Sequence, residues 1–420
     1  MIKIFEYGSV SENEIFKRAS SAPDVSAPVR EIIASVREGG DKALLAFCER
    51  FDKVKPDPLE ATESEFAEAE KECGEEFFAV LKKAAGNIEE FHAKQKREGF
   101  VIDRGDGSYI GQKITPLKRV GLYVPGGTAA YPSSVLMNVI PAKVAGVREI
   151  IMCTPNANKT VLAAAKLAGV DKIFKIGGAQ AIAAMAFGTR QIPRVNKIVG
   201  PGNIFVTLAK KEVYGHCDID MLAGPSEILI VADEFANPVY AAADMLSQAE
   251  HDPLACSIII TTNEDLAEEI AAQVEIQLEQ LPRKEIAAAS IERNGLIVVA
   301  ENLDEAVDFA NFSAPEHLEL LTQNPFELLP KIKNAGAIFL GAYSPEPLGD
   351  YLAGPNHVLP TGGTAKFYSV LNVETFLKRT SLISYTRKDL LNVAADVKRL
   401  AEAEGLQAHA EAIRKREENS

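Results

Sequence analysis

Two series of short apolar runs alternate with helical patterns through the middle of the chain. The first series has β-branched runs at 119–124, 149–153, 172–175 and 197–199. The second series has such runs at 227–232, 256–260, 295–299 and 337–340. Helical stretches separate the runs, which is the βαβ order of a parallel sheet covered on both faces. The pattern therefore predicts an α/β protein with two doubly wound lobes.

Helical patterns dominate the first hundred residues and the last thirty. A start at Ser26–Pro28 and a break at Gly39–Gly40 predict one helix, with a second beginning directly afterwards. The Ala- and Glu-rich segment 62–96 predicts a pair of long, largely exposed helices. A final helical stretch is expected from about 387 to 416.

Composition narrows the class of protein. A chain of 420 residues with 47% hydrophobic residues can form two or three domains. Its net charge of -14 repels phosphate backbones, so no nucleic-acid partner is expected. Neither a signal peptide nor an apolar run of ~18 residues is present, so no membrane association is expected. The five scattered cysteines favour a reducing compartment, and we expect a cytoplasmic protein.

Histidines beside carboxylates or amides indicate chemistry. Four of the six histidines have such neighbours, in the sets Gln248 with His251, Glu316 with His317, Asp350 with His357, and Glu404 with His409. Imidazole nitrogens with amide and carboxylate oxygens suit a divalent ion such as zinc. The remaining Glu and His side chains can transfer protons near neutral pH. The sets together predict metal-assisted chemistry.

Two of these sets also have plainer interpretations. Gln248 and His251 share one helix face, but a three-residue spacing arises often by chance. Glu316 and His317 can share a pocket only at an irregular strand entry, which Pro315 favours. Otherwise they form a solvated turn.

The other two sets differ in strength. Glycines and prolines fix the loop 348–361 that presents Asp350 and His357, and turn chemistry alone does not require a histidine there. Glu404 and His409 are five residues apart and point roughly 140° apart on a helix. That spacing by itself favours two surface positions.

Glycine-rich turns follow several predicted strands, at 124–127, 177–180, 200–203 and 224–226. Such turns let the backbone approach a phosphate or substrate closely. They match neither G-x-G-x-x-G nor G-x-x-x-x-G-K-[ST], so they do not establish a dinucleotide site by themselves. His92 and His216 have no polar company and are expected to be exposed. Cys153 is expected in the core rather than as a nucleophile, because no base lies near it in sequence.

In this order, these segments resemble the histidinol dehydrogenase family over essentially the whole chain. The segments that carry the resemblance are 121–127, 131–138, 177–181, 200–203, 223–227, 247–251, 315–317, 349–350, 356–360 and 408–409. Each segment is weakly specific, whereas the set is highly specific.

The resemblance implies a four-electron oxidation of L-histidinol to L-histidine through bound L-histidinaldehyde, with two NAD+ consumed and one Zn2+ per subunit. By position, the zinc ligands, which would also hold the substrate, are Gln248, His251, Asp350 and His409. Other substrate-contacting positions are Ser226, His317, His357 and Glu404. The NAD-binding positions are Tyr123, Gln180 and Asn203. His317 would accept the alcohol proton, and Glu316 would activate water for the aldehyde step.

The resemblance also implies a domain plan of two incomplete Rossmann-like doubly wound lobes with small N-terminal and C-terminal helical extensions. The expected segments are an extension at 1–19, a zinc and substrate lobe at 20–119 with 228–367, an NAD lobe at 120–227 and a C-terminal arm at 368–420. The extension and the arm would reach over the partner in a homodimer with shared active sites.

Two other classes of function remain open at this point. In a zinc-dependent hydrolase or lyase acting on a small polar metabolite, the glycine turns would be purely structural. A non-catalytic dimeric scaffold is disfavoured by four separate sets of acid, amide and imidazole groups. NADH formation with histidinol distinguishes these classes.

Overall fold

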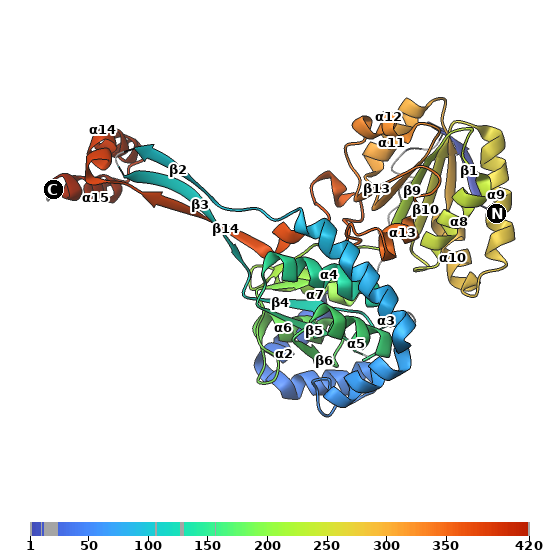
Figure 1. The fold of residues 1–420 in the computed structure, drawn as a ribbon, viewed down its shortest axis with the longest axis horizontal. Helices are drawn as coiled ribbons and strands as arrows, with labels where there is room; N and C mark the ends of the chain where they lie inside the picture. The colour runs from blue at the N-terminus through green and yellow to red at the C-terminus, as the bar shows by residue number, and fades with distance from the viewer. Residues whose placement is uncertain are drawn as a thin grey trace. The chain divides into compact units, whose positions relative to one another are not determined.

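Three β-sheets organise the residues that the computed structural model describes, namely 2–9, 11, 24–105, 107–126, 130–155 and 157–418. Two parallel sheets lie in one unit of the chain, Met1–Gln95 with Leu117–Phe376. An antiparallel sheet lies in the other unit, Lys96–Pro116 with Leu377–Ser420. Figure 1 shows the elements of each unit. The α/β class that the sequence predicts is confirmed.

The first βαβ series forms a five-stranded parallel sheet with strand order β6-β5-β4-β7-β8. Its strands are β4 (Arg119–Tyr123), β5 (Glu149–Cys153), β6 (Lys172–Phe174), β7 (Lys197–Val199) and β8 (Asp218–Ile219). Its connecting helices are α4 (Pro132–Ala145), α5 (Lys159–Ala168), α6 (Gly178–Phe187) and α7 (Ile204–Val213). The strands are mostly buried, as expected for a parallel sheet covered on both faces.

Helices α2 (Ser26–Phe47) and α3 (Glu63–Ala93) cover the two faces of this same sheet. Val36 of α2 packs in one core with α6 and α7, and Ile88 of α3 packs in another with α4 and α5. The assignment of residues 20–119 to the lobe of 228–367 is therefore wrong for these two helices. An amphipathic pattern shows that a helix covers a core, but it does not show which sheet is covered.

Glycines interrupt both helices. Gly40 has a φ of 54° inside α2, which confirms the predicted break at the Gly39–Gly40 pair. Gly74 has a φ of 73° inside α3, so α3 consists of two helical segments that meet at a kink, in agreement with the predicted pair of helices. A reciprocal capping box between Thr62 and Glu65 begins α3.

The second series forms a six-stranded parallel sheet with strand order β1-β11-β10-β9-β12-β13. Its strands are β1 (Lys3–Glu6), β9 (Glu227–Ala232), β10 (Cys256–Thr261), β11 (Leu296–Val299), β12 (His317–Leu321) and β13 (Ala337–Leu340). Its helices are α8 (Pro238–Ala249), α9 (Glu264–Leu278), α10 (Lys284–Asn294), α11 (Leu303–Ser313), α12 (Pro325–Leu328) and α13 (Glu346–Tyr351). Helices α8, α9 and α10 share a core on one face, and α11 packs on the other.

The N-terminal strand corrects a second expectation. Residues 3–6 pair in parallel with β11 and form an edge of the six-stranded sheet. The expected separate extension at 1–19 is therefore wrong for its described strand, while 12–19 lie outside the described residues.

The other unit contains an antiparallel sheet and a helical hairpin. Its sheet has strand order β14-β3-β2, built from β2 (Phe100–Gly105), β3 (Ser108–Pro116) and β14 (Leu377–Ser384). Its helices are α14 (Arg387–Ala403) and α15 (Gln407–Glu418). The Ser108 hydroxyl accepts the N–H of Thr386 at 2.8 Å, which ties β3 to the start of α14. The predicted helical tail is present. The antiparallel sheet of this unit, with β2 and β3 from residues 96–116, was not predicted.

No helix in the described part of the chain combines the length and the apolar composition needed to cross a membrane.

Candidate active site

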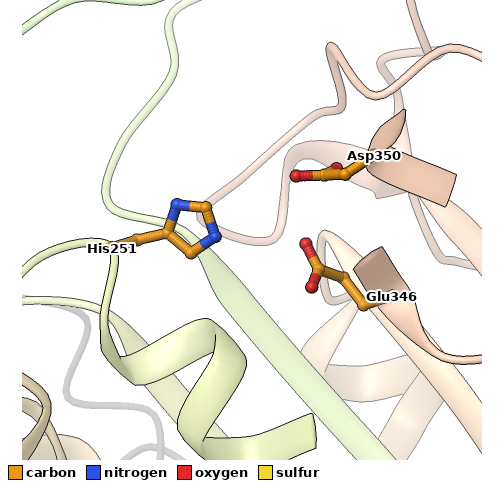
Figure 2. Close-up of side chains that lie close together, drawn as sticks. All are labelled: His251, Glu346 and Asp350. Carbon is orange, nitrogen blue, oxygen red and sulfur yellow. The ribbon is translucent and has the colours of Figure 1, made fainter. Parts of the chain in front are cut away.

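Three side chains gather where α8 ends and α13 begins. Ligand atoms of His251, Glu346 and Asp350 all lie within 4.8 Å of one another. His251 follows the end of α8, and the two carboxylates project toward it from α13, as Figure 2 shows. Glu346 and Asp350 are four residues apart and so share one helix face. One imidazole and two carboxylates can hold a divalent cation.

Gln248 supplies the observation that best tests this donor set. It lies three residues before His251, it is fully buried, and neither its amide oxygen nor its nitrogen has a hydrogen-bond partner among the described residues. An unsatisfied buried amide costs about 1–3 kcal/mol. A bound cation at the amide oxygen would remove part of this cost, so the residues present fit a metal ion.

Two buried catalytic candidates lie at the start of β12. Glu316 Oε2 accepts the N–H of Glu227 at 2.9 Å, and Nδ1 of His317 lies 3.1 Å from the backbone oxygen of the same residue. A carbonyl oxygen only accepts, so Nδ1 carries the hydrogen. The Nε2 atom of His317 is then an acceptor, and it has no hydrogen-bond partner among the described residues.

Burial sets the protonation of this pair. It lowers the pKa of His317 to about 4, so the imidazole is neutral near pH 7. Burial also raises the pKa of Glu316 well above its ordinary value. The site thus combines a neutral proton acceptor with a carboxylate of increased basicity.

Asp350 links the metal candidates to His357. Its Oδ1 lies 3.3 Å from Nδ1 of His357. Burial alone would raise the pKa of Asp350, but the hydrogen bond with His357 and the nearby His317 and His251 lower it to about 2. Asp350 is therefore an anion near neutral pH, as a metal ligand must be.

A cluster of buried carboxyl groups, which was not predicted from the sequence, supports α13. Glu319 Oε1 accepts the N–H of Glu346 at 2.7 Å, and Ser247 Oγ donates to Glu346 Oε2 at 3.0 Å. Asp244 is hydrogen-bonded to Glu319. Burial is the first cause of the raised pKa in Asp244, Glu319 and Glu346. The alternation of Glu319 with His317 along β12 was an available signal for one of the three.

The predicted cofactor residues lie at the carboxyl ends of strands in the five-stranded sheet. The Tyr123 hydroxyl, at the end of β4, accepts the N–H of Gly178 at 3.0 Å. Gln180 is buried, and its Nε2 has no hydrogen-bond partner among the described residues. A Cβ on Gly200 would lie 2.2 Å from the backbone oxygen of Tyr123, so only glycine fits this turn. Asn203 caps α7 through its side-chain oxygen. Ligands of open α/β sheets bind at this edge.

The proposed bases Glu316 and His317, by contrast, lie at the amino end of a strand, β12. Glu227 and His317 are the first residues of β9 and β12. The half-buried Ser226 directly precedes β9. The carboxyl-end rule for α/β sheets therefore did not point to this site, although the sets of acid, amide and imidazole residues did.

The remaining predicted positions are more scattered. Glu404 and His409 belong to the other unit of the chain and are exposed there. His216 is exposed and Cys153 is fully buried, which confirms both expectations. The expected exposure of His92 is wrong, because this residue is fully buried.

Two lobes built on parallel sheets, one with a candidate metal centre and one with close glycine turns, define a two-lobed α/β enzyme. Residues 16–417 match the sequence model of the histidinol dehydrogenase family. The chain belongs to the histidinol dehydrogenase family.

Individual relatives agree with this assignment over their whole length. The histidinol dehydrogenase of Clostridium acetobutylicum is 51% identical over 99% of both chains. That of Listeria monocytogenes is 53% identical over 98% of this chain and 99% of its own. The crystal structure of histidinol dehydrogenase from Elizabethkingia anophelis has a TM-score of 0.94 and 38% identity, and covers 100% of this chain and 98% of its own. The fold and the family therefore agree.

Proposed function

We propose that this protein oxidises L-histidinol to L-histidine, the last step of histidine biosynthesis, in two hydride transfers to NAD+ through bound L-histidinaldehyde. Membership of the histidinol dehydrogenase family supports the reaction. The structural observation that carries the proposal is the Nε2 of the buried, neutral His317, which has no hydrogen-bond partner among the described residues and interacts electrostatically with Asp350 and His251 of the metal candidates.

Zinc is the proposed metal, with Gln248, His251 and Asp350 as its ligands in this subunit. The buried Gln248 amide, which has no hydrogen-bond partner among the described residues, and the anionic Asp350 support this choice. When bound, zinc supplies a Lewis acid that orients the substrate's imidazole and amine. His409 is proposed as the fourth ligand and Glu404 as a substrate contact, both supplied by the partner subunit's C-terminal arm.

His317 is the proposed base for the first oxidation. Its Nδ1–H is engaged by the Glu227 carbonyl, so only Nε2 can take the alcohol proton as hydride leaves for the nicotinamide. The low pKa keeps that nitrogen unprotonated at neutral pH. The backbone of His317 is held in β12 and its ring is held by the Glu227 carbonyl, which favours a fixed geometry for the transfer.

Glu316 is the proposed base for the second oxidation. The aldehyde must be hydrated before a second hydride can leave, and that water needs a proton acceptor. Burial raises the pKa of Glu316 well above its ordinary value, so its carboxylate is a stronger base than a solvent-exposed one. Ser226 and His357 are proposed to contact the substrate.

Tyr123, Gln180 and Asn203 are proposed to bind NAD+. The Nε2 of the buried Gln180, for which the described part of the chain provides no acceptor, gives a donor for a ligand oxygen. At Gly200 the chain passes so close to the backbone oxygen of Tyr123 that no Cβ fits, which fixes the turn beside Tyr123.

A homodimer is the proposed assembly. Apolar side chains are strongly exposed in the unit that holds the C-terminal arm, including Val101 at 62%, Ile383 at 78% and Leu400 at 67%. A second copy of the chain would cover such a surface. A cytoplasmic location is also proposed, and the five free cysteines agree with a reducing compartment.

Product analysis tests the proposal against a zinc-dependent hydrolase or lyase. The protein is incubated with L-histidinol, with and without NAD+, and the products are separated by chromatography. We expect L-histidine only when NAD+ is present. Consumption of histidinol without NAD+ would support the hydrolase or lyase instead.

A further inference from the structure

The segment that carries His357 is held against α3. Asn87 of α3 donates from Nδ2 to the backbone oxygen of Leu352 at 2.7 Å. Gly354 has a φ of 103°, and a Cβ there would lie 2.7 Å from the Asn87 oxygen. The chain can pass this close to the helix only because residue 354 is glycine. The close contact between this segment and α3 therefore depends on a residue of each, Asn87 on the helix and Gly354 in the segment.

Asn356 makes the central contacts of this segment. It is 4% exposed, and its Nδ2 donates to the Met137 oxygen at 2.6 Å and lies 3.3 Å from Nε2 of His92. Its Oδ1 accepts the N–H of Val358 at 2.9 Å. The two amide hydrogens thus reach two different helices, α4 and α3, while the oxygen fixes the local turn. Every polar atom of this buried side chain has a partner.

His92 has the tautomer that this arrangement needs. Its Nδ1 lies 2.7 Å from the backbone oxygen of Ile88, so Nδ1 carries the hydrogen. Nε2 is then an acceptor and faces the Asn356 amide. The ring is fully buried, and burial lowers its pKa, which agrees with a neutral imidazole. Both ring nitrogens of His92 are engaged by protein groups, so neither is available to a substrate.

The consequence lies one residue further along the chain. His357 follows Asn356 directly, and its Nδ1 lies 3.3 Å from Oδ1 of Asp350 in the metal-binding cluster. We propose that His92 is a positioning residue that acts through Asn356 to hold the backbone of His357, and so sets where this imidazole meets the substrate. This inference rests on the proposed function, because it assumes that His357 contacts histidinol.

Paired variants test the proposal. His92→Leu fills a similar volume without the acceptor, and His92→Gln keeps an oxygen that can accept from Asn356. With both proteins loaded with metal, we expect His92→Leu to raise KM for histidinol roughly tenfold or more, with KM for NAD+ little changed. His92→Gln should restore most of the histidinol affinity.

Leu81→Val is the matched control, because it trims a buried apolar side chain of the same helix, outside this network. It should lower the thermal unfolding midpoint and leave both KM values near wild type. If His92→Leu changes only the unfolding midpoint, or if His92→Leu and His92→Gln behave alike, His92 is a packing residue and the proposal is wrong.

A variant on the loop side keeps the test decisive if His92→Leu does not fold. Asn356→Ser removes the same contact from the other partner and should raise KM for histidinol in the same way. Where both variants fold, the double variant should be no worse than Asn356→Ser alone, because the two residues act through one contact. Additive losses would contradict the proposal. Absence of NADH formation in wild type would instead overturn the proposed function, whatever the variants do.

Discussion

His317 and Glu227 are joined by a 3.1 Å contact from an imidazole nitrogen to a backbone oxygen. The N–H of the same Glu227 is donated to Glu316 at 2.9 Å. One residue at the start of β9 therefore orients both proposed bases. Each base can be changed without disturbing the backbone group that holds the other, so their roles can be separated.

Glu316→Gln should separate the two oxidations. Glutamine keeps an oxygen that can accept the Glu227 N–H, but it cannot take a proton from water. We expect the aldehyde step to slow on the order of 10²-fold or more, with a much smaller loss in the alcohol step. Stopped-flow measurements with histidinol and with histidinaldehyde supplied directly give the two rates. Equal losses in both steps would show that Glu316 is not the base for water.

Cys153→Ala should retain near-normal turnover. The thiol is fully buried in the core, and burial raises its pKa far above the neutral range, so no thiolate is available for a covalent route. Some loss of thermal stability is expected from the small cavity. Steady-state rates at matched metal content check this prediction. Loss of most aldehyde oxidation in the variant would support a thiohemiacetal and overturn the water mechanism.

Asp244→Asn should change how stability depends on pH in the metal-free protein. Burial raises the folded-state pKa of Asp244 from 3.8 to about 6, so the folded protein binds a proton that the unfolded chain releases earlier. This stabilisation is complete below the ordinary pKa and is lost as pH rises through the folded-state pKa. Asparagine can donate to Glu319 at every pH, so the variant should not show this loss.

Thermal unfolding between pH 4 and pH 8 measures the effect. The unfolding midpoint of Asp244→Asn should gain on wild type by roughly 2–4 °C or more as pH rises across this interval. Asp308→Asn, an exposed change of the same charge on α11, is the control and should keep a constant difference. A constant difference for Asp244→Asn as well would contradict the prediction.

Mixing variants should reveal an active site shared between subunits. A His251→Ala subunit and a His409→Ala subunit form heterodimers in which one site of two has both histidines intact, if the arm is exchanged. Random mixing makes half the dimers heterodimers, so activity should approach about a quarter of wild type.

The control for this experiment mixes His251→Ala with Asp350→Ala. Both residues belong to one unit of the chain, so every heterodimer site keeps one lesion and no activity should return. Recovery in the control, or no recovery in the first mixture after demonstrated subunit exchange, would refute arm exchange.

Local patterns predicted much of the fold because the central strands are continuous buried runs. Glu227–Ala232 is buried at every position and was recognised as a strand from its composition alone. The strand Phe100–Gly105 is exposed at every position, so it has no alternation to detect. The sheet that α2 and α3 cover is a tertiary choice that their own sequences do not state.

The site residues, too, could be predicted only where the sequence itself places them together. Side-by-side residues such as Glu316 and His317 could be found because they are neighbours in sequence. Glu346 was missed, because a six-residue helix in a Gly/Pro-rich segment has too few positions to show periodicity. His92 was misplaced on the surface because its partner Asn356 is 264 residues away.

The most direct test of metal-dependent histidinol oxidation measures how many NADH form per histidinol consumed, in native and in metal-depleted protein. With histidinol limiting, we predict about two NADH and one L-histidine per histidinol. Chelation should abolish turnover with little change in circular dichroism, since both parallel sheets have large apolar cores that contain none of the proposed ligands, and added Zn2+ should restore it. Full NADH formation in protein shown to be metal-free, or histidinol consumed without NADH, would contradict a metal-centred histidinol dehydrogenase.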